Sequence, residues 1–337
     1  MNVGLVGYGL AGSVFHAPLI QSVTGLKLAA VVTSRAEQLG EGLRVYPNLD
    51  DLLSDRSVGV VVIASPTALH FEHARAALFA GKHVVVDKPL STTVKEADEL
   101  IALASHEKRV LTVFQNRRWD GDFLTILRLT RENALGHLHY YEAHFDRFRP
   151  QIKKGWREVP GPGSGILFDL GAHLIDQALC LFGMPGAVTA DVLAQRADAQ
   201  VDDYFHVLLD YGKRRAVLHA STLVTDGGYR LIAHGDAGSF LKRGLDTQED
   251  ALKRGVRPGA PDWGADDPQN YGELTPASGE RQKIITNRGC YEHFYAALAK
   301  CLTEGAPPPV DPRDSRNGLH IIEAALRSSK ERRTIAL

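Results

Sequence analysis

Cysteine is scarce in this sequence: its 337 residues include only Cys180, Cys290 and Cys301. Their wide spacing and odd number exclude a disulfide framework and match no zinc-binding pattern. We therefore expect reduced thiols that pack as small apolar side chains in a cytoplasmic protein.

Long apolar runs and an excess of charge are also missing. No stretch approaches the roughly 18 consecutive apolar residues of a membrane-spanning helix. The chain starts on a strand-like segment, so we expect no signal peptide. Lys and Arg number 39 against 40 Asp and Glu, whereas a protein that binds nucleic acid or an anionic membrane usually has a basic excess. We therefore expect neither as a partner.

The length suggests about two domains, and the change of pattern near residue 120 places them at 1–119 and 120–337. The first part alternates short apolar strands with helices. We expect strands at 2–6, 26–32, 58–64, 83–86 and 110–114, with helices at 69–81 and 94–108 among them. Continuous apolar strands separated by helices indicate a parallel sheet covered on both faces. The pattern predicts an α/β doubly wound domain of the Rossmann type.

A G-x-G-x-x-G turn follows the first strand. Its residues are Gly7, Tyr8, Gly9, Leu10, Ala11 and Gly12, and it opens a helix that we expect Pro18 to interrupt or reshape. In such turns the first glycine permits a tight bend, the second lets backbone amides approach a pyrophosphate, and the third allows close packing of helix on strand. A ligand-free turn is the alternative, but the position within a βαβ unit favours a dinucleotide site.

The second strand indicates which nicotinamide cofactor is bound. An NAD site usually places Asp or Glu just after this strand, on the ribose hydroxyls. Here Ser34 and Arg35 follow instead, and a guanidinium suits the 2′-phosphate of NADP. We expect NADP to be preferred, with NAD as the alternative cofactor. Arg35 could also be an ordinary exposed loop residue.

The second part has longer and more alternating strands. We expect them at 137–147, 188–196, 204–211, 215–223, 229–234 and 282–286, with a hairpin turn at 236–238 and a long, partly irregular excursion at 244–281. Helices at about 289–304 and 313–331 close the chain. This pattern predicts an α+β domain with a large, open, mostly antiparallel sheet. Because few helices remain to cover it, we expect a homodimer or homotetramer formed through the open sheet.

One helix, expected at 165–183, carries chemically useful side chains. Asp169 and His173 are four residues apart, so they share a helix face, and Asp176 follows on that face. An imidazole beside a carboxylate can exchange a proton near neutral pH. A simple surface contact, a satisfied part-buried histidine and a metal site with Asp176 are the alternatives, although no HExxH pattern or cysteine ligand supports a metal.

A second motif ends the strand at 83–86. The sequence VVVDKPL runs from a buried strand into Asp87, Lys88 and Pro89. A lysine at a strand end is usually a surface residue. Pro89 restricts the backbone of the residues before it and so helps to fix how the chain leaves the strand.

Taken together, the G-x-G-x-x-G turn, the DKP motif and DLGAH on a helix resemble the glucose–fructose oxidoreductase / inositol dehydrogenase / MocA family over essentially the whole chain. The usual EKP of that family appears here as Asp87-Lys88-Pro89. FHAPLI at 15–20, FQNRRWDGDFLT at 114–125, HFDRFRP at 144–150 and GPGSGILFDL at 161–170 resemble the subgroup with NADP-dependent scyllo-inositol dehydrogenases.

The resemblance implies roles for individual residues. Lys88, Asp169 and His173 would be catalytic and would contact the substrate. Further cofactor contacts are expected from the strand-end residues Ser65, Pro66, Thr67, His70, Asp87, Lys88 and Asn116. Further substrate contacts are expected from Arg117, Arg118, Arg147, Arg149 and Trp156, although Arg117 and Arg118 could instead form interdomain salt bridges.

The implied reaction is reversible oxidation of a secondary alcohol on a cyclic polyol or sugar, with hydride transfer to the nicotinamide and without a metal. His173 would act as general base, Asp169 would orient it or contact another hydroxyl, and Lys88 would polarise the reacting oxygen. A reductase of another ketosugar or carbonyl compound is the alternative enzyme. A nucleotide-sensing regulator without catalysis is the rival from another class, and the presence of all three residues argues against it.

Overall fold

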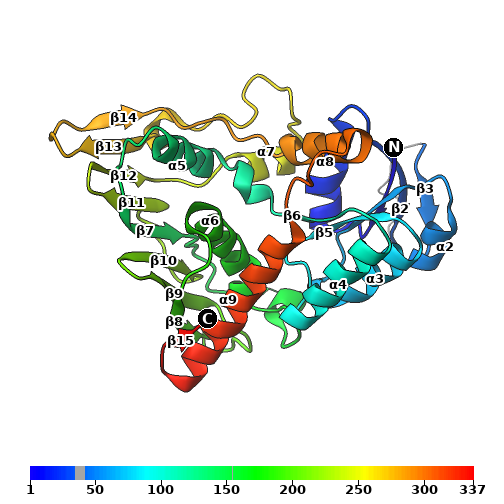
Figure 1. Cartoon of the computed structure of the whole chain (residues 1–337), viewed down its shortest axis with the longest axis horizontal. Helices are drawn as coiled ribbons and strands as arrows, with labels where there is room; N and C mark the ends of the chain where they lie inside the picture. The colour runs from blue at the N-terminus through cyan, green and yellow to red at the C-terminus, as the bar shows by residue number, and fades with distance from the viewer. Residues whose placement is uncertain (35–41, 154) are drawn as a thin grey trace. The chain divides into compact units, whose positions relative to one another are not determined.

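The computed structural model describes residues 1–34, 42–153 and 155–337 (Figure 1). These residues form two compact units. The first comprises Met1–Asn116, Gln248–Trp263 and Cys290–Arg316, and the second comprises Arg117–Thr247, Gly264–Gly289 and Asn317–Leu337. No helix among the described residues is both long and apolar enough to cross a membrane.

The first unit is built on a parallel six-stranded sheet with the strand order β3-β2-β1-β4-β5-β6. The strands are β1 (Asn2–Val6), β2 (Lys27–Val32), β3 (Arg44–Tyr46), β4 (Val60–Ile63), β5 (His83–Asp87) and β6 (Leu111–Phe114). This is the order of a dinucleotide-binding Rossmann sheet. Every residue of β4 and β6 is buried, which explains why these strands are continuous apolar runs rather than alternating ones.

Helices flank this sheet. They are α1 (Ala17–Gln21), α2 (Leu49–Ser54), α3 (His70–Phe79), α4 (Val94–His106), α7 (Gln248–Lys253) and α8 (Glu292–Glu304). Figure 1 shows α3 and α4 side by side, and α3 packs against β4 and β5. A capping box formed by Thr93 and Glu96 sets the start of α4. The last long helix, α9 (Pro312–Glu331), begins in the first unit and ends in the second.

The second unit contains a nine-stranded sheet with the order β14-β13-β12-β11-β7-β10-β9-β8-β15. Its strands are β7 (Leu138–His144), β8 (Ala187–Leu193), β9 (Tyr204–Tyr211), β10 (Arg214–Ser221), β11 (Leu231–Gly235), β12 (Gly238–Lys242), β13 (Gly272–Pro276), β14 (Gln282–Ile284) and β15 (Ile335–Ala336). Neighbours are antiparallel except β7 and β10, which are parallel. The prediction of a mostly antiparallel sheet is confirmed.

The two faces of the nine-stranded sheet differ. Tyr141 and Ala143 of β7 are fully buried on the face that carries α6 (Ala172–Phe182), where Tyr141 packs edge-on against Phe182. The alternate residues Glu142 and His144 point to the opposite face and remain partly exposed. This alternation is the period of two of a strand with one face in the core.

Some local elements were not predicted. The segment 244–281, expected to be a long, partly irregular excursion, contains α7 and β13. Helix α5 (Gly121–Arg131) was missed, although Phe123, Ile126 and Leu129 form a buried stripe at helical spacing. The short elements β3 and α2 were also missed, because three to six residues give too little periodicity to identify.

Candidate functional site

The glycine turn after β1 has the geometry of a phosphate cradle. Gly7 has φ +96°, and a Cβ there would lie 2.7 Å from the Ala64 carbonyl oxygen. A Cβ on Gly12 would lie 2.1 Å from the Gly7 oxygen, whereas one on Gly9 would meet no atom within 4 Å. Gly7 and Gly12 are therefore required for packing, and the backbone at Gly9 faces open space. That combination fits the close approach of a pyrophosphate.

The helix after this turn does not begin as a regular α-helix. Ala11–His16 form a π-helical segment, and α1 starts at Ala17 with Pro18 in its first turn. Pro18 was expected to interrupt or reshape this helix. It lies directly after the π-helical segment, in the first turn of α1, where an α-helix tolerates proline. Tyr8 and Ala11 are half-buried, and the side chain of Leu10 is exposed.

The end of β2 carries the residues expected to select the cofactor. Ser34 is exposed directly beyond this strand. Arg35 lies outside the described residues. The NADP preference drawn from this pair therefore stays a prediction.

Four neighbouring parallel strands end at one edge of the first sheet, and their ends carry the predicted cofactor and substrate residues. Gly7 follows β1, Ser65 follows β4, Lys88 follows β5 and Asn116 follows β6. Ligands of open α/β sheets bind at this carboxyl edge. Asn116 is 6% exposed and begins a short 3₁₀ turn.

The loop after β4 is held by His70. Its Nδ1 lies 2.7 Å from the Pro89 oxygen and its Nε2 lies 3.0 Å from the Ser65 oxygen. Burial is the main influence on the pKa of His70 and lowers it. A neutral ring has one N–H and donates to one of these carbonyls at a time. The His70 side chain thus joins the loops that follow β4 and β5. In the loop after β4, Pro66 is exposed and Thr67 is buried.

Lys88 stands where β5 leaves the sheet. Its backbone amide donates to the Asp87 carboxylate at 2.9 Å, and its peptide bond to Pro89 is cis. Asp87 Oδ1 lies 4.0 Å from Nε2 of the fully buried His16, whose Nδ1 lies 2.6 Å from the Tyr295 hydroxyl. Burial lowers the pKa of His16 to about 4, so this ring is neutral at physiological pH. His16 is therefore no cationic partner for the Asp87 side chain, which accepts the backbone amide of Lys88.

In the second unit, the helix expected at 165–183 has a different start. Leu167–Gly171 form a π-helical turn, and α6 follows from Ala172. The 3.6-residue period used to place Asp169 and His173 on one face does not hold across the π-turn, and such turns frequently occur at functional sites. Asp202 holds this start, because its carboxylate accepts the Leu167 amide at 2.7 Å.

Asp169 and Trp156 are linked by Arg157. The guanidinium Nε of Arg157 donates to Asp169 Oδ1 at 3.1 Å, and the same group lies 4.3 Å above the Trp156 ring. The side chain of Asp169 is 30% exposed, so it remains accessible to a ligand. Arg147 is half-buried and Arg149 is exposed.

His173 is 7% exposed and lies against Phe145, with ring centroids 6.5 Å apart. The guanidiniums of Arg117 and Arg230 also lie over Phe145, at 4.8 and 4.2 Å from its centroid. Sequence reasoning missed Phe145 as the support of the imidazole. The only available signal was its place in HFDRFRP.

A buried polar network continues from these arginines. Arg230 pairs with Asp122 at 2.9 Å, and both are 2% exposed. Arg230 also donates to the Gln177 side chain at 3.0 Å, and Gln177 donates to the Arg117 backbone oxygen at 2.9 Å. The network fixes the helix face that bears His173.

Arg118 and Asp176 form a bidentate ion pair, in which two guanidinium nitrogens donate to the two carboxylate oxygens at 2.7 and 2.6 Å. Arg117 similarly lies 3.3 Å from Asp120. All four residues belong to the second unit. These arginines are therefore engaged in ion pairs, as the alternative interpretation expected, but with partners in their own unit. The pairing also occupies Asp176, which the metal alternative required.

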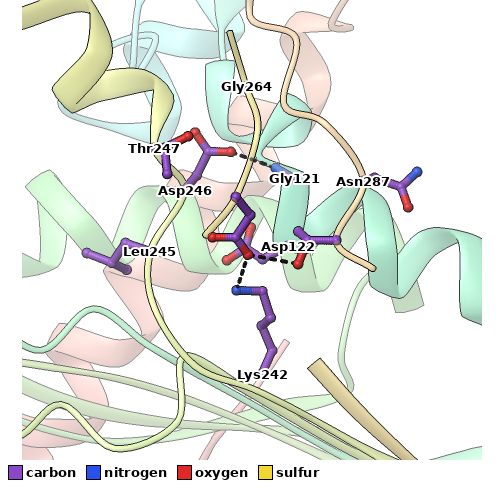
Figure 2. Close-up of a pocket in the computed structure, with 10 residues that line it drawn as sticks. Gly121, Asp122, Lys242, Leu245, Asp246, Thr247, Gly264 and Asn287 are labelled. Carbon is purple, nitrogen blue, oxygen red and sulfur yellow. Dashed lines mark hydrogen bonds and ion pairs between the residues drawn. The ribbon is translucent and has the colours of Figure 1, made fainter. Parts of the chain in front are cut away.

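Two other charged clusters fulfil structural roles. Arg196 pairs with Glu158 at 2.6 Å and Asp203 at 2.7 Å, so it ties the 156–158 turn to the start of β9. In the hollow of Figure 2, the buried Lys242 lies 2.9 Å from Asp266, and Thr286 donates to the same carboxylate oxygen. Oδ1 of Asp266 is buried there without a hydrogen-bond partner among the described residues, while its Oδ2 makes both of these contacts.

Comparison with known proteins agrees with this architecture. The model of the oxidoreductase family NAD-binding Rossmann fold matches residues 1–115, and that of the oxidoreductase family C-terminal α/β domain matches residues 128–337. The chain belongs to the Gfo/Idh/MocA oxidoreductase family. Its first unit is accordingly an NAD(P)-binding domain, and the protein is an oxidoreductase.

Relatives within the Gfo/Idh/MocA family cover the entire chain. The scyllo-inositol 2-dehydrogenase (NADP(+)) IolW of Bacillus subtilis (strain 168) is 43% identical over 100% of this chain and 96% of the relative. The oxidoreductase YdgJ of Escherichia coli (strain K12), whose activity is uncharacterized, is 44% identical over 100% and 99%. The solved structure of YvaA from Bacillus subtilis has a TM-score of 0.98 and 43% identity over 100% and 98%.

Proposed function

We propose that this oxidoreductase is an NADP-dependent dehydrogenase of a cyclic polyol or sugar, with scyllo-inositol as the first candidate substrate. The observation that carries the proposal is Lys88 at the carboxyl edge of the same parallel sheet whose strand β1 ends in the glycine cradle. Full-length identity of 43% to a relative named an NADP-linked scyllo-inositol dehydrogenase supports the substrate and the cofactor.

The residues of the first unit would hold the cofactor. Gly7, Gly9 and Gly12 would place backbone amides against its pyrophosphate, and Ser34 and Arg35 would contact the 2′-phosphate. Ser65, Pro66, Thr67 and Asn116 would line the strand ends beside it. When bound, NADP supplies the hydride acceptor of the oxidation.

The remaining chemistry belongs to the side chains of this chain. We propose that His173 accepts the proton of the substrate hydroxyl, because its ring is held by Phe145 and has restricted access to water. Lys88 donates a hydrogen bond to the oxygen that develops negative charge. Asp169 binds a neighbouring hydroxyl or orients the imidazole. Arg157 restrains Asp169 in the absence of substrate.

An absorbance assay of NADP⁺ and NAD⁺ reduction across inositols, aldoses and ketoses, run in both directions, tests this proposal. NADP-linked turnover of an inositol or its keto form is the expected result. Turnover of another sugar would replace the substrate and keep the mechanism. Higher catalytic efficiency with NAD⁺ would remove the cofactor assignment, and tight NADP binding without turnover would contradict the enzyme assignment for the compounds tested.

We further propose that the chain works in the cytoplasm as a homodimer or homotetramer. The partly exposed face of the nine-stranded sheet, which includes Glu142, His144 and His219, is the surface expected to meet a second copy. Sedimentation equilibrium should give an even multiple of the 36.8 kDa chain mass. A single monomeric species at all concentrations would contradict this assembly.

A further inference from the structure

A row of histidines crosses the nine-stranded sheet on the face opposite α6. His144 of β7 is the register partner of His219 of β10, and His219 is the register partner of His206 of β9. Cross-strand partners point to the same face of a sheet. The three imidazoles therefore lie side by side on one surface that the proposed oxidoreductase chemistry does not use.

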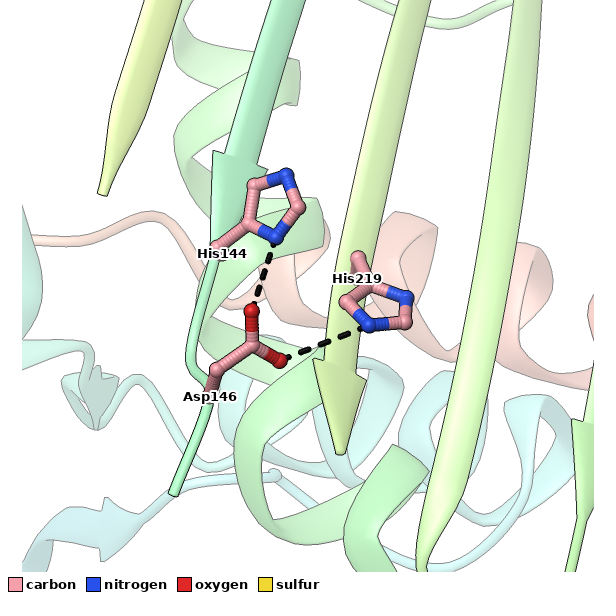
Figure 3. Close-up of side chains that lie close together, drawn as sticks. All are labelled: His144, Asp146 and His219. Carbon is pink, nitrogen blue, oxygen red and sulfur yellow. Dashed lines mark hydrogen bonds and ion pairs between the residues drawn. The ribbon is translucent and has the colours of Figure 1, made fainter. Parts of the chain in front are cut away.

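A carboxylate lies between two of these rings. Figure 3 shows Asp146, just beyond the end of β7, with its side chain directed between His144 and His219. Its Oδ2 lies 3.0 Å from His144 Nδ1, and its Oδ1 lies 3.4 Å from His219 Nε2. One donor atom from each residue lies within 4.8 Å of the others.

These spacings suit a small cation. Bonds of 2.0–2.2 Å in a tetrahedral zinc site place neighbouring donor atoms about 3.4 Å apart. Both carboxylate–imidazole contacts are within a few tenths of an ångström of that spacing, although they use different oxygens of Asp146. The donor atoms lie within 4.8 Å of one another, so the set must contract to close on an ion. In the single chain the Asp146, His144 and His219 side chains are 6, 20 and 15% exposed, and the proposed second copy would cover this face.

An outer carboxylate also orients the cluster. Glu142 Oε1 lies 2.6 Å from Nε2 of His144, on the side of the ring away from Asp146. When His144 loses one proton to a metal ion and keeps Nε2–H toward Glu142, its Nδ1 is the nitrogen that can bind the ion. Carboxylates commonly hold metal-binding histidines in this way. His219 has a buried Nδ1 without a hydrogen-bond partner among the described residues, so hydrogen bonding within the cluster does not account for every polar atom.

We propose that His144, Asp146 and His219 bind one divalent transition-metal ion, for which Zn²⁺ is the best match, on the face of the sheet opposite α6. Two imidazoles and one carboxylate are zinc-type donors, whereas Mg²⁺ and Ca²⁺ prefer oxygen ligands. Water completes the coordination. The ion would join the end of β7 to β10, which form the parallel pair of an otherwise antiparallel sheet.

The competing account is a hydrogen-bonded cluster that holds a proton instead of a metal. Burial alone would lower the pKa of His144, but hydrogen bonds to Asp146 and Glu142 outweigh it and raise the pKa to about 9. The two accounts differ in whether the cluster binds a metal ion with saturation.

Isothermal titration of the chelator-treated, full-length protein with ZnCl₂ decides between them, and the visible spectrum of bound Co²⁺ reports the ligand set. We expect saturation at one Zn²⁺ per chain. His144→Ala and His219→Ala should each weaken binding at least about 100-fold, and Glu142→Gln by about 10- to 100-fold. No saturable site in the wild type would overturn the proposal.

A matched control is available on the same face. His234 of β11 is exposed, lies opposite Tyr140 and bonds to Ser239 at 2.8 Å. His234→Ala should leave zinc affinity unchanged. If either ligand variant misfolds, Asp146→Asn keeps the side-chain size and should still weaken binding at least about 10-fold. Unchanged zinc affinity in folded Asp146→Asn and His219→Ala, or equal loss in His234→Ala, would overturn the site.

Discussion

The two units place their candidate functional groups by different means. The first unit uses backbone: strand ends, a glycine cradle and loops joined by His70. The second unit uses charge: Arg118 with Asp176, Arg230 with Asp122, and Arg196 with two carboxylates support the region of His173 and Asp169. The residues that we propose for the cofactor are thus placed by local motifs, whereas those that we propose for the substrate are supported by ion pairs between side chains distant in the sequence.

The sharpest test of this comparison is the ion pair below His173. Asp176→Ala leaves Arg118 without its carboxylate, and the paired side chains are only 3% and 16% exposed. Loss of one partner of a buried pair costs about 3–5 kcal/mol, so urea unfolding should show a decrease of that size. Asp98→Ala is the control, because its pair with Arg316 is exposed and its loss should cost at most about 1 kcal/mol. Similar decreases in the free energy of unfolding of the two variants would show that the buried pair stabilises the protein no more than the exposed pair.

Low pH tests whether the stability of the first unit also depends on the charge of a buried side chain, His16. The pKa of His16 is lowered from 6.5 to about 4 by burial, so the unfolded chain binds this proton first as the pH falls. The contribution of neutral His16 to the free energy of unfolding is therefore present above pH 6.5 and is lost as the pH falls from 6.5 to 4. From pH 7.5 to 5 this group alone should reduce the free energy of unfolding by about 2 kcal/mol.

His16→Gln should remove that part of the pH dependence in urea unfolding. His106→Gln should leave it in place, because the His106 side chain is 82% exposed. An identical pH dependence in wild type and His16→Gln would show that His16 does not titrate as its burial requires.

Two glycine variants should separate binding from folding in the cradle. Gly9→Ala adds a methyl group into open space, so stability should stay within about 0.5 kcal/mol. The same group would obstruct the approach of a pyrophosphate, and NADP affinity should fall about tenfold, or 1.4 kcal/mol. Gly12→Ala collides with the Gly7 oxygen and should reduce both stability and affinity. Normal NADP affinity in Gly9→Ala would contradict the cradle.

Much of the first unit could be predicted from the sequence because its signals are local. Continuous apolar strands indicated the parallel sheet, and the turn at Gly7–Gly12 indicated the nucleotide site. Boundaries agreed within a few residues, as in the helix expected at 94–108 and found at Val94–His106. Patterns among residues close together in the sequence are enough to identify these strands, helices and the glycine turn.

The supports of the second site could not be predicted in the same way. Arg118 and Asp176 are 58 residues apart, and Arg230 and Gln177 are 53 apart, so no spacing rule connects them. The π-turn at Leu167–Gly171 gave no sequence signal either. Asp202, whose carboxylate accepts the Leu167 amide, is 35 residues further along the chain. Tertiary packing decides these contacts.

The most direct test of the account compares turnover with cofactor binding in Lys88→Ala and His173→Asn. Both proteins should keep NADP binding largely intact while kcat falls about a hundredfold to a thousandfold on the substrate that the wild type oxidises. Lys95→Ala, on the exposed side of α4, is the control and should keep full activity. Near-normal turnover in either active-site variant would contradict the central claim that Lys88 and His173 perform the chemistry.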